Sequence, residues 1–104
     1  MSDEIWHEVA NADDVAPDEP IKVQVGDEDI ALYHVDGDIF ATANMGTHAF
    51  ASMADGYQEG EEIECPLHEG RFNIKTGAPL CPPVSEPLKT FPVKVENGKV
   101  MVKV

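Results

Sequence analysis

Residues 89–104, KTFPVKVENGKVMVKV, carry the clearest structural signal in this sequence. Apolar and polar side chains alternate through 91–96 and again through 100–104, which is the period of a strand with one buried face. Asn97 and Gly98 lie between the two runs and favour the positive φ angles of a two-residue turn. The segment is therefore predicted to form a β-hairpin.

The same pattern continues toward the N-terminus. Asp36-Gly37 is a second hairpin signal, because it also separates two apolar runs. A single helical turn is predicted over 11–15, where Asn11 is a suitable cap and Pro17 ends the segment. The remaining runs of strand length are 21–25, 30–35, 39–42 and 72–75. The predicted fold class is all-β.

Composition limits the classes of function. The chain has 104 residues, with 7 basic and 20 acidic side chains and a net charge of −13, which suits one small domain that does not bind nucleic acid. Twelve of the acidic residues lie within 1–40, alongside the single basic residue Lys22. This face is either a solvated surface or a docking surface for a basic protein. No apolar run is long enough to span a membrane, the start of the chain is acidic, and the expected location is the cytoplasm.

The middle of the chain differs from both ends. Between Thr42 and Leu88 the sequence is rich in Gly, Pro and His and has little strand periodicity. A compact domain seldom carries so long an irregular stretch unless a function or a ligand holds it together. We therefore predict an insertion on a small antiparallel β sandwich or barrel, with no second independent domain.

This stretch contains two short motifs with metal-binding side chains. Gly46-Thr47-His48 is followed, after sixteen residues, by Cys65-Pro66-Leu67-His68. A thiolate and an imidazole on a tight turn are typical ligands of zinc or iron. The residues alone leave two alternatives open, a metal site or a buried cysteine near a hydrogen-bonded histidine. His7 and His34 lie in strands without ligand-spaced neighbours and are not expected to bind metal.

The chain resembles the Rieske-type ferredoxins of bacterial aromatic-ring dioxygenase systems of the naphthalene and biphenyl type. In that family a Cys-x-His motif is followed by a spacer and a Cys-x-x-His motif. The resemblance covers nearly the whole chain and includes 40–42, 55–57, 65–72, 76–77, 82–84 and the hairpin at 89–104.

The resemblance implies a Rieske fold, with a basal β domain over about 1–42 and 86–104 and a metal-binding subdomain over about 43–85. It also implies a [2Fe–2S] cluster that passes single electrons from a reductase to a terminal oxygenase. Such a carrier is not itself catalytic and docks transiently through electrostatic attraction. The resemblance places an apolar docking rim beside the exposed imidazoles, formed by Met45, Phe50, Leu67 and Pro82.

One ligand position departs from the family pattern. The resemblance assigns Cys65 and position 46 to one iron, and His48 and His68 to the other, but Gly46 has no side chain to donate. The simplest origin is a substituted or engineered variant with a defective cluster.

Three alternatives follow from this departure. His48, Cys65 and His68 are sufficient to hold one iron or zinc ion, and an open iron position would have weak oxygen chemistry. Cys81 is a candidate substitute ligand, because the resemblance places it beside the cluster. The third alternative is a metal-free structural module.

Overall fold

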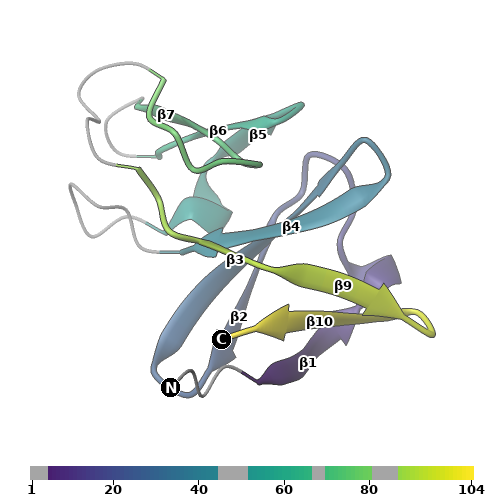
Figure 1. The fold of residues 1–104 in the computed structure, drawn as a ribbon. Helices are drawn as coiled ribbons and strands as arrows, with labels where there is room; N and C mark the ends of the chain where they lie inside the picture. Colours follow the sequence, from purple (N-terminus) through teal and green to yellow (C-terminus); the bar gives the residue numbers. More distant parts are fainter. Residues whose placement is uncertain (1–4, 45–51, 67–69, 81–86) are drawn as a thin grey trace.

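The computed structural model describes residues 5–44, 52–66, 70–80 and 87–104. Within these ranges the chain forms antiparallel strands and two short 3-10 helices, η1 and η2, and confirms the all-β prediction (Figure 1). Strands at the two ends of the chain are β1 (Trp6–Asn11), β2 (Ile21–Val25), β3 (Glu28–Val35), β4 (Asp38–Ala43), β8 (Thr90–Phe91), β9 (Val93–Glu96) and β10 (Lys99–Lys103). The middle contributes η2 (Met53–Asp55), β5 (Tyr57–Glu59), β6 (Glu62–Glu64) and β7 (Arg71–Asn73), and η1 is Ala12–Asp14.

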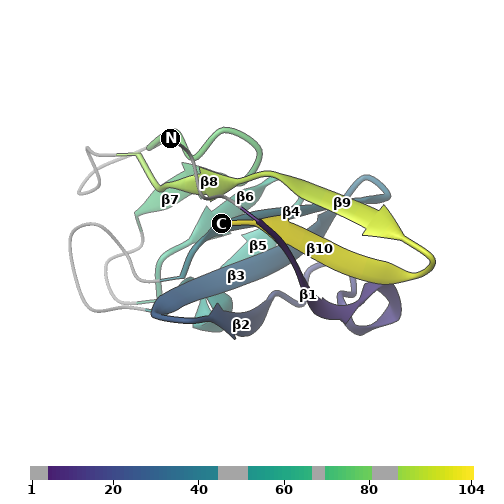
Figure 2. The ribbon, with the colours of Figure 1, turned by 60° about the horizontal axis from the view of Figure 1, so that its bottom comes forward.

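The strands form three sheets, with orders β1-β10-β9, β2-β3-β4-β8 and β5-β6-β7. The sheet containing β3 is the middle layer, because two separate apolar clusters pack against its opposite faces. Ile30 and Leu32 point to the cluster shared with β10, whereas Ala31, Tyr33 and Val35 point to the cluster shared with β5–β7. A strand buried on both faces needs a continuous apolar run, which the sequence of β3 supplies. Figure 2 shows the layers from a second direction.

Both predicted hairpins are present. Asp36 and Gly37 have φ angles of 52° and 87°, and Asn97 and Gly98 have φ angles of 53° and 75°. These positive angles match the twist of the flanking strands and set their register. The predicted helical turn is also confirmed as η1, where the Asp14 carboxylate accepts a hydrogen bond from the N–H of Asn11 at 3.3 Å.

Two strand predictions need correction. The run 91–96 is split into β8 and β9 at Pro92, which has no N–H to continue the ladder. The run 72–75 is replaced by β7, which ends at Asn73 because the Asn73 Oδ1 atom accepts hydrogen bonds from the N–H groups of Lys75 and Thr76 and turns the chain.

The stretch predicted as irregular contains the sheet β5-β6-β7. Each of its strands has only three residues, too short for a period of two to stand out in the sequence. Gln58 of β5 ties this sheet to the middle layer, since its Nε2 atom donates to the carbonyl of His34 at 2.9 Å. No helix within the described ranges is long and apolar enough to cross a membrane. The proposed boundaries between basal domain and subdomain stay a prediction.

Tyr33 is the largest fully buried side chain of the described core. Its hydroxyl is hydrogen-bonded to Thr42 Oγ1 at 2.8 Å, and its burial raises the pKa of the phenol far above the usual value. The folded chain therefore keeps this proton at pH values where the unfolded chain has released it, so Tyr33 contributes stability below pH of about 10 and loses it as the pH rises further.

We expect the free energy of unfolding to fall more steeply with pH in the unmodified chain than in Tyr33→Phe. Below pH of about 10, Tyr33→Phe should cost about 1 kcal/mol because the bond to Thr42 is lost. Above pH of about 10, the difference in unfolding free energy between the unmodified chain and Tyr33→Phe should shrink by at most about 1.4 kcal/mol per pH unit. Urea unfolding at several pH values from neutral to alkaline measures this difference. A difference that stays constant across the series would contradict the assigned burial of the phenol.

Candidate metal centre

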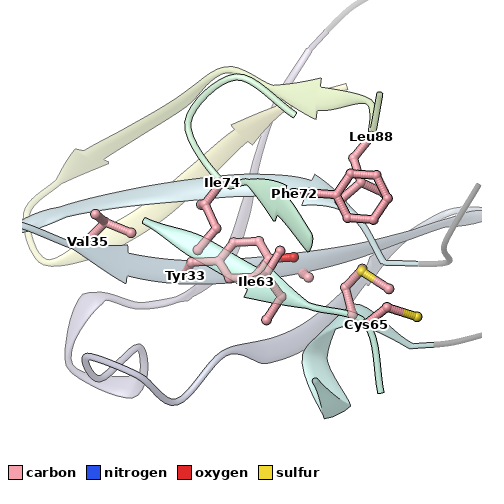
Figure 3. Close-up of a cluster of buried hydrophobic side chains, with 9 residues drawn as sticks. Tyr33, Val35, Ile63, Cys65, Phe72, Ile74 and Leu88 are labelled. Atoms are coloured by element: carbon pink, nitrogen blue, oxygen red, sulfur yellow. The ribbon is translucent and has the colours of Figure 1, made fainter. Parts of the chain in front are cut away.

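Cys65 is the one predicted metal ligand that lies within the described residues. It follows β6 directly and its side chain is 1% exposed, in a cluster with Met53, Phe72 and Leu88 (Figure 3). The N–H of Cys65 donates to the carbonyl of Gly70 at 2.7 Å, which extends the β6–β7 ladder by one step. The thiol is therefore held at the end of a short hairpin, with its backbone fixed from both sides.

The other predicted site residues lie outside the described ranges. These residues are the ligands His48 and His68, the position Gly46, the candidate substitute Cys81, and the rim residues Met45, Phe50, Leu67 and Pro82. Within 5–44, 52–66, 70–80 and 87–104, no group of three or more His, Cys, Asp or Glu side chains is close enough to hold a metal ion. His7 and His34 are half-buried strand residues, as the sequence predicts for them. The ligand set itself stays a prediction.

Asn44 holds together the two ends of the segment that carries Gly46 and His48. Its side chain is 1% exposed, and its Oδ1 atom accepts a hydrogen bond from the N–H of Ala54 at 2.9 Å. Its Nδ2 atom donates to Ser52 Oγ at 2.9 Å, and its carbonyl accepts from the N–H of Met53 at 2.6 Å. Sequence reasoning missed this residue, because a lone asparagine after a strand reads as an ordinary turn residue.

A second backbone contact closes the segment that carries Cys81 and Pro82. The N–H of Leu88 donates to the carbonyl of Gly77 at 2.8 Å, and Gly77 has a φ of 79°. A Cβ atom at Gly77 would overlap the carbonyl oxygen of Leu88. Only glycine satisfies both conditions without strain, so a glycine at position 77 is a structural requirement of this end of the molecule.

The three segments that carry the predicted site residues share one apolar base. Met53 follows the segment with Gly46 and His48, Cys65 precedes the one with His68, and Leu88 follows the one with Cys81; all three side chains belong to one buried cluster. Figure 3 shows Cys65 and Leu88 at the same end of this cluster, with Val35 at the other. Residues as far apart in the sequence as Met53 and Leu88 thus belong to the same buried cluster.

The outer face of the sheet β5-β6-β7 is charged. Arg71 lies among three carboxylates, 3.5 Å from Glu59, 3.3 Å from Glu62 and 3.1 Å from Glu64. Hydrogen bonds that the guanidinium donates to Glu62 and then to Glu64 raise the pKa of Arg71. These contacts link all three strands of the sheet, so Arg71 joins β7 to β6 immediately before Cys65.

Comparison with known protein families now identifies the architecture. Residues 5–92 match the model of the Rieske [2Fe-2S] domain. The chain belongs to the Rieske [2Fe-2S] domain family. This confirms the resemblance inferred from the sequence.

Individual Rieske proteins are similar over nearly the whole chain. A Ralstonia sp. protein, the ferredoxin component of naphthalene 1,2-dioxygenase/salicylate 5-hydroxylase systems, is 50% identical over 98 residues, covering 94% of each chain. The structure of Sphingomonas yanoikuyae B1 ferredoxin matches with a TM-score of 0.92 and 40% identity, over 96% of this chain and 99% of that one. A ferredoxin from a complex of reduced oxygenase and oxidized ferredoxin in carbazole 1,9a-dioxygenase matches with a TM-score of 0.89 and 40% identity, over 94% and 92% of the two chains.

Proposed function

We propose that this chain is a ferredoxin component of an aromatic-ring dioxygenase system, built to pass single electrons from a reductase to a terminal oxygenase. The observation that carries the proposal is the 50% identity to such a component over 94% of both chains. The transient partners are the reductase and the oxygenase, and the net charge of −13 favours basic docking surfaces on them.

We also propose that the metal centre of this particular chain is one thiolate short. A Rieske cluster is held by two cysteines and two histidines, and the motif positions supply His48, Cys65 and His68 with a glycine at position 46. This donor set does not fit an intact [2Fe–2S] cluster. The residues that are present suit a single iron or zinc ion, which is the second candidate state of the site.

Two further states of the site remain proposals. Cys81 would complete the donor set if its thiol took the place of the missing one, and the segment that carries it is closed by the contact between Gly77 and Leu88. A metal-free chain would instead act as a structural or docking module. In each state the surface that meets the partners is the proposed rim formed by Met45, Phe50, Leu67 and Pro82.

A competition experiment tests the docking function independently of the metal centre. A chain that docks normally but carries electrons poorly should inhibit an assay in which the Ralstonia ferredoxin component couples its own reductase and oxygenase. We expect the initial rate to fall by about half when the unmodified chain is in roughly tenfold excess, if both proteins dock through similar rims. The measurement is the rate of naphthalene oxidation at fixed ferredoxin and increasing amounts of this chain.

Two variants control this experiment. Leu67→Lys places a charge in the proposed rim and should relieve the inhibition, whereas Asp27→Asn, at an exposed turn between β2 and β3, should not. An unchanged rate at high excess of the unmodified chain would overturn the proposed docking function. Equal inhibition by Leu67→Lys would overturn the proposed rim.

A further inference from the structure

The edge of the β sandwich is open between β4 and β9. β8 pairs with β4 only where Thr90 and Phe91 lie opposite Thr42 and Ala41. After Pro92 the chain leaves β4 and pairs with β10 instead, and no strand pairing joins β9 to β4 in the described part of the chain. Figure 1 shows the two strands diverging toward their hairpin ends.

One side of this opening is an unpaired edge of β4. The N–H of Ala43 donates to the carbonyl of Lys89 at 2.8 Å, and Ala41 is paired with Phe91. Because backbone groups alternate in direction along a strand, Ile39 points its N–H and C=O the same way as Ala41 and Ala43. At Ile39 the pairing has already ended, so its backbone groups face the opening.

The other side is the edge of β9. The N–H of Lys103 donates to the carbonyl of Pro92 at 3.0 Å, which directs the backbone groups of alternate residues toward β10. The N–H and C=O groups of Val93 and Val95 therefore point away from β10 and toward β4. Two strand edges thus face one another without a strand between them.

The opening is lined by apolar side chains. Val95 lies opposite Val100 on the core face of its sheet, yet Val95 is 47% exposed whereas Val100 is fully buried. With Ile39, Phe40 and Val93 it lines an open groove of about 410 Å³, which continues past Ile39 and Val95 into a second hollow of about 310 Å³. We call this feature the β4–β9 groove; the first hollow is lined by Asp38, Ile39, Phe40, Val93, Lys94 and Val95.

The rim of the β4–β9 groove is negatively charged. Asp13 and Asp38 line it, and neither takes part in a salt bridge among the described residues. The one lysine at the groove, Lys94, is already engaged, with its Nζ atom 4.5 Å from the centroid of the Trp6 ring and 3.7 Å from Glu96. An incoming cation would therefore meet two uncompensated carboxylates.

From these features we propose that the β4–β9 groove binds an extended segment of a partner protein in which aliphatic residues alternate with lysine or arginine. The free edge of β9 at Val93 and Val95 hydrogen-bonds its backbone, the apolar lining takes its aliphatic side chains, and Asp13 and Asp38 pair with its cations. A second copy of this chain suits the groove poorly, because each copy has a net charge of −13.

The β4–β9 groove and the Cys65 end of the molecule lie apart. Val35, the last residue before the hairpin that leads into β4, lies at the opposite end of its core cluster from Cys65 (Figure 3). A segment in the groove therefore leaves the Cys65 end of the molecule accessible. The groove would hold one partner while the other end meets a second, and this inference does not rest on the proposed electron-transfer function.

Titration of the isotope-labelled full chain with the synthetic peptide KVKVKVK tests the proposal by nuclear magnetic resonance. We expect the amide signals of Ile39, Val93 and Val95 to shift together, with weak, saturable binding. KSKSKSK lacks the aliphatic side chains and EVEVEVE reverses the charge, so both should bind at least about tenfold more weakly. The experiment needs no metal, and its outcome is independent of the state of the metal centre.

Matched variants separate the groove from general electrostatic attraction. The double change Asp13→Asn and Asp38→Asn should weaken KVKVKVK binding about tenfold, and Val95→Thr should weaken it while preserving the strand. Asp27→Asn, an exposed charge change away from the groove, should have little effect. The proposal is overturned if KSKSKSK binds as well as KVKVKVK, or if the shifts lie elsewhere. Sedimentation of the chain alone as a dimer that Val95→Thr dissociates would also overturn it, since a second copy would then fill the groove.

Discussion

The Gly46→Cys variant is expected to be a red-brown protein with two iron ions and two acid-labile sulfides per chain, whereas the unmodified chain is not. The reason is the donor set: the change adds the second thiolate that a Rieske cluster requires, and a thiolate compensates much of the charge of ferric iron. The measurements are iron, zinc and sulfide analysis, the visible absorption spectrum, and the electron paramagnetic resonance signal of the reduced protein.

Three controls make the Gly46→Cys result specific. Gly46→Ser adds a side chain of similar size without a thiolate and should not restore the cluster. Combining Gly46→Cys with Cys65→Ser should abolish it again. Adding Cys81→Ser to Gly46→Cys should leave it intact if Cys81 is not a ligand.

The unmodified chain provides the decisive comparison. One metal ion per chain without sulfide would support the mononuclear site, and a melting temperature unaffected by chelator would support a metal-free module. A full complement of iron and sulfide in the unmodified chain would show that the missing-ligand argument is wrong. Loss of that complement on Cys81→Ser would then assign the second thiolate to Cys81.

The Phe72→Ala variant should lose about 3–5 kcal/mol of unfolding free energy. Phe72 is fully buried in the cluster that contains Cys65 and Leu88, and it pairs with Ile63 across the β6–β7 hairpin. Truncation would leave a cavity in the buried cluster that contains Cys65. The total free energy of unfolding of a domain of this size is only about 5–15 kcal/mol. The hairpin that holds Cys65 should therefore become unstable at moderate temperature in Phe72→Ala.

Urea unfolding at constant metal content measures the effect of Phe72→Ala. Phe72→Leu keeps most of the apolar volume and should cost less than about 1.5 kcal/mol. Tyr57→Ala removes an aromatic ring that is 70% exposed on the neighbouring strand β5, and should change stability by about 0.5 kcal/mol or less. A cost for Phe72→Ala no larger than that for Tyr57→Ala would contradict the role of Phe72 in supporting the site.

Local signals in the sequence were sufficient for the outer parts of the fold. The turns at Asp36-Gly37 and Asn97-Gly98 require positive φ angles that few residue pairs adopt, so the dipeptides predict both hairpins directly. The sheet β5-β6-β7 was not predicted, because its three-residue strands are stabilised by long-range packing against Tyr33 and Leu88 rather than by their own pattern.

The candidate site, like the fold, was predicted only in part from the sequence. Two motifs separated by sixteen residues predicted the family, and Gly46 is the basis of the proposed ligand deficit, because glycine has no side chain that binds a metal. The residues that hold the ends of the site segments could not be recognised in the sequence. Asn44 is significant only because its side chain is buried and hydrogen-bonded to both Ser52 and Ala54. No local rule distinguishes such an asparagine from one in an ordinary turn.

The sequence by itself determined the all-β class, the hairpins and the Rieske family, since each depends on local geometry or on the chemistry of its motif side chains. The glycine at position 46 is the basis of the proposed thiolate deficit. Only the tertiary structure decided that β3 is buried on both faces, that Cys65 shares one apolar base with Met53 and Leu88, and that β4 and β9 part to leave an open groove. These features depend on which distant segments pack together, and packing is a property of the whole folded chain.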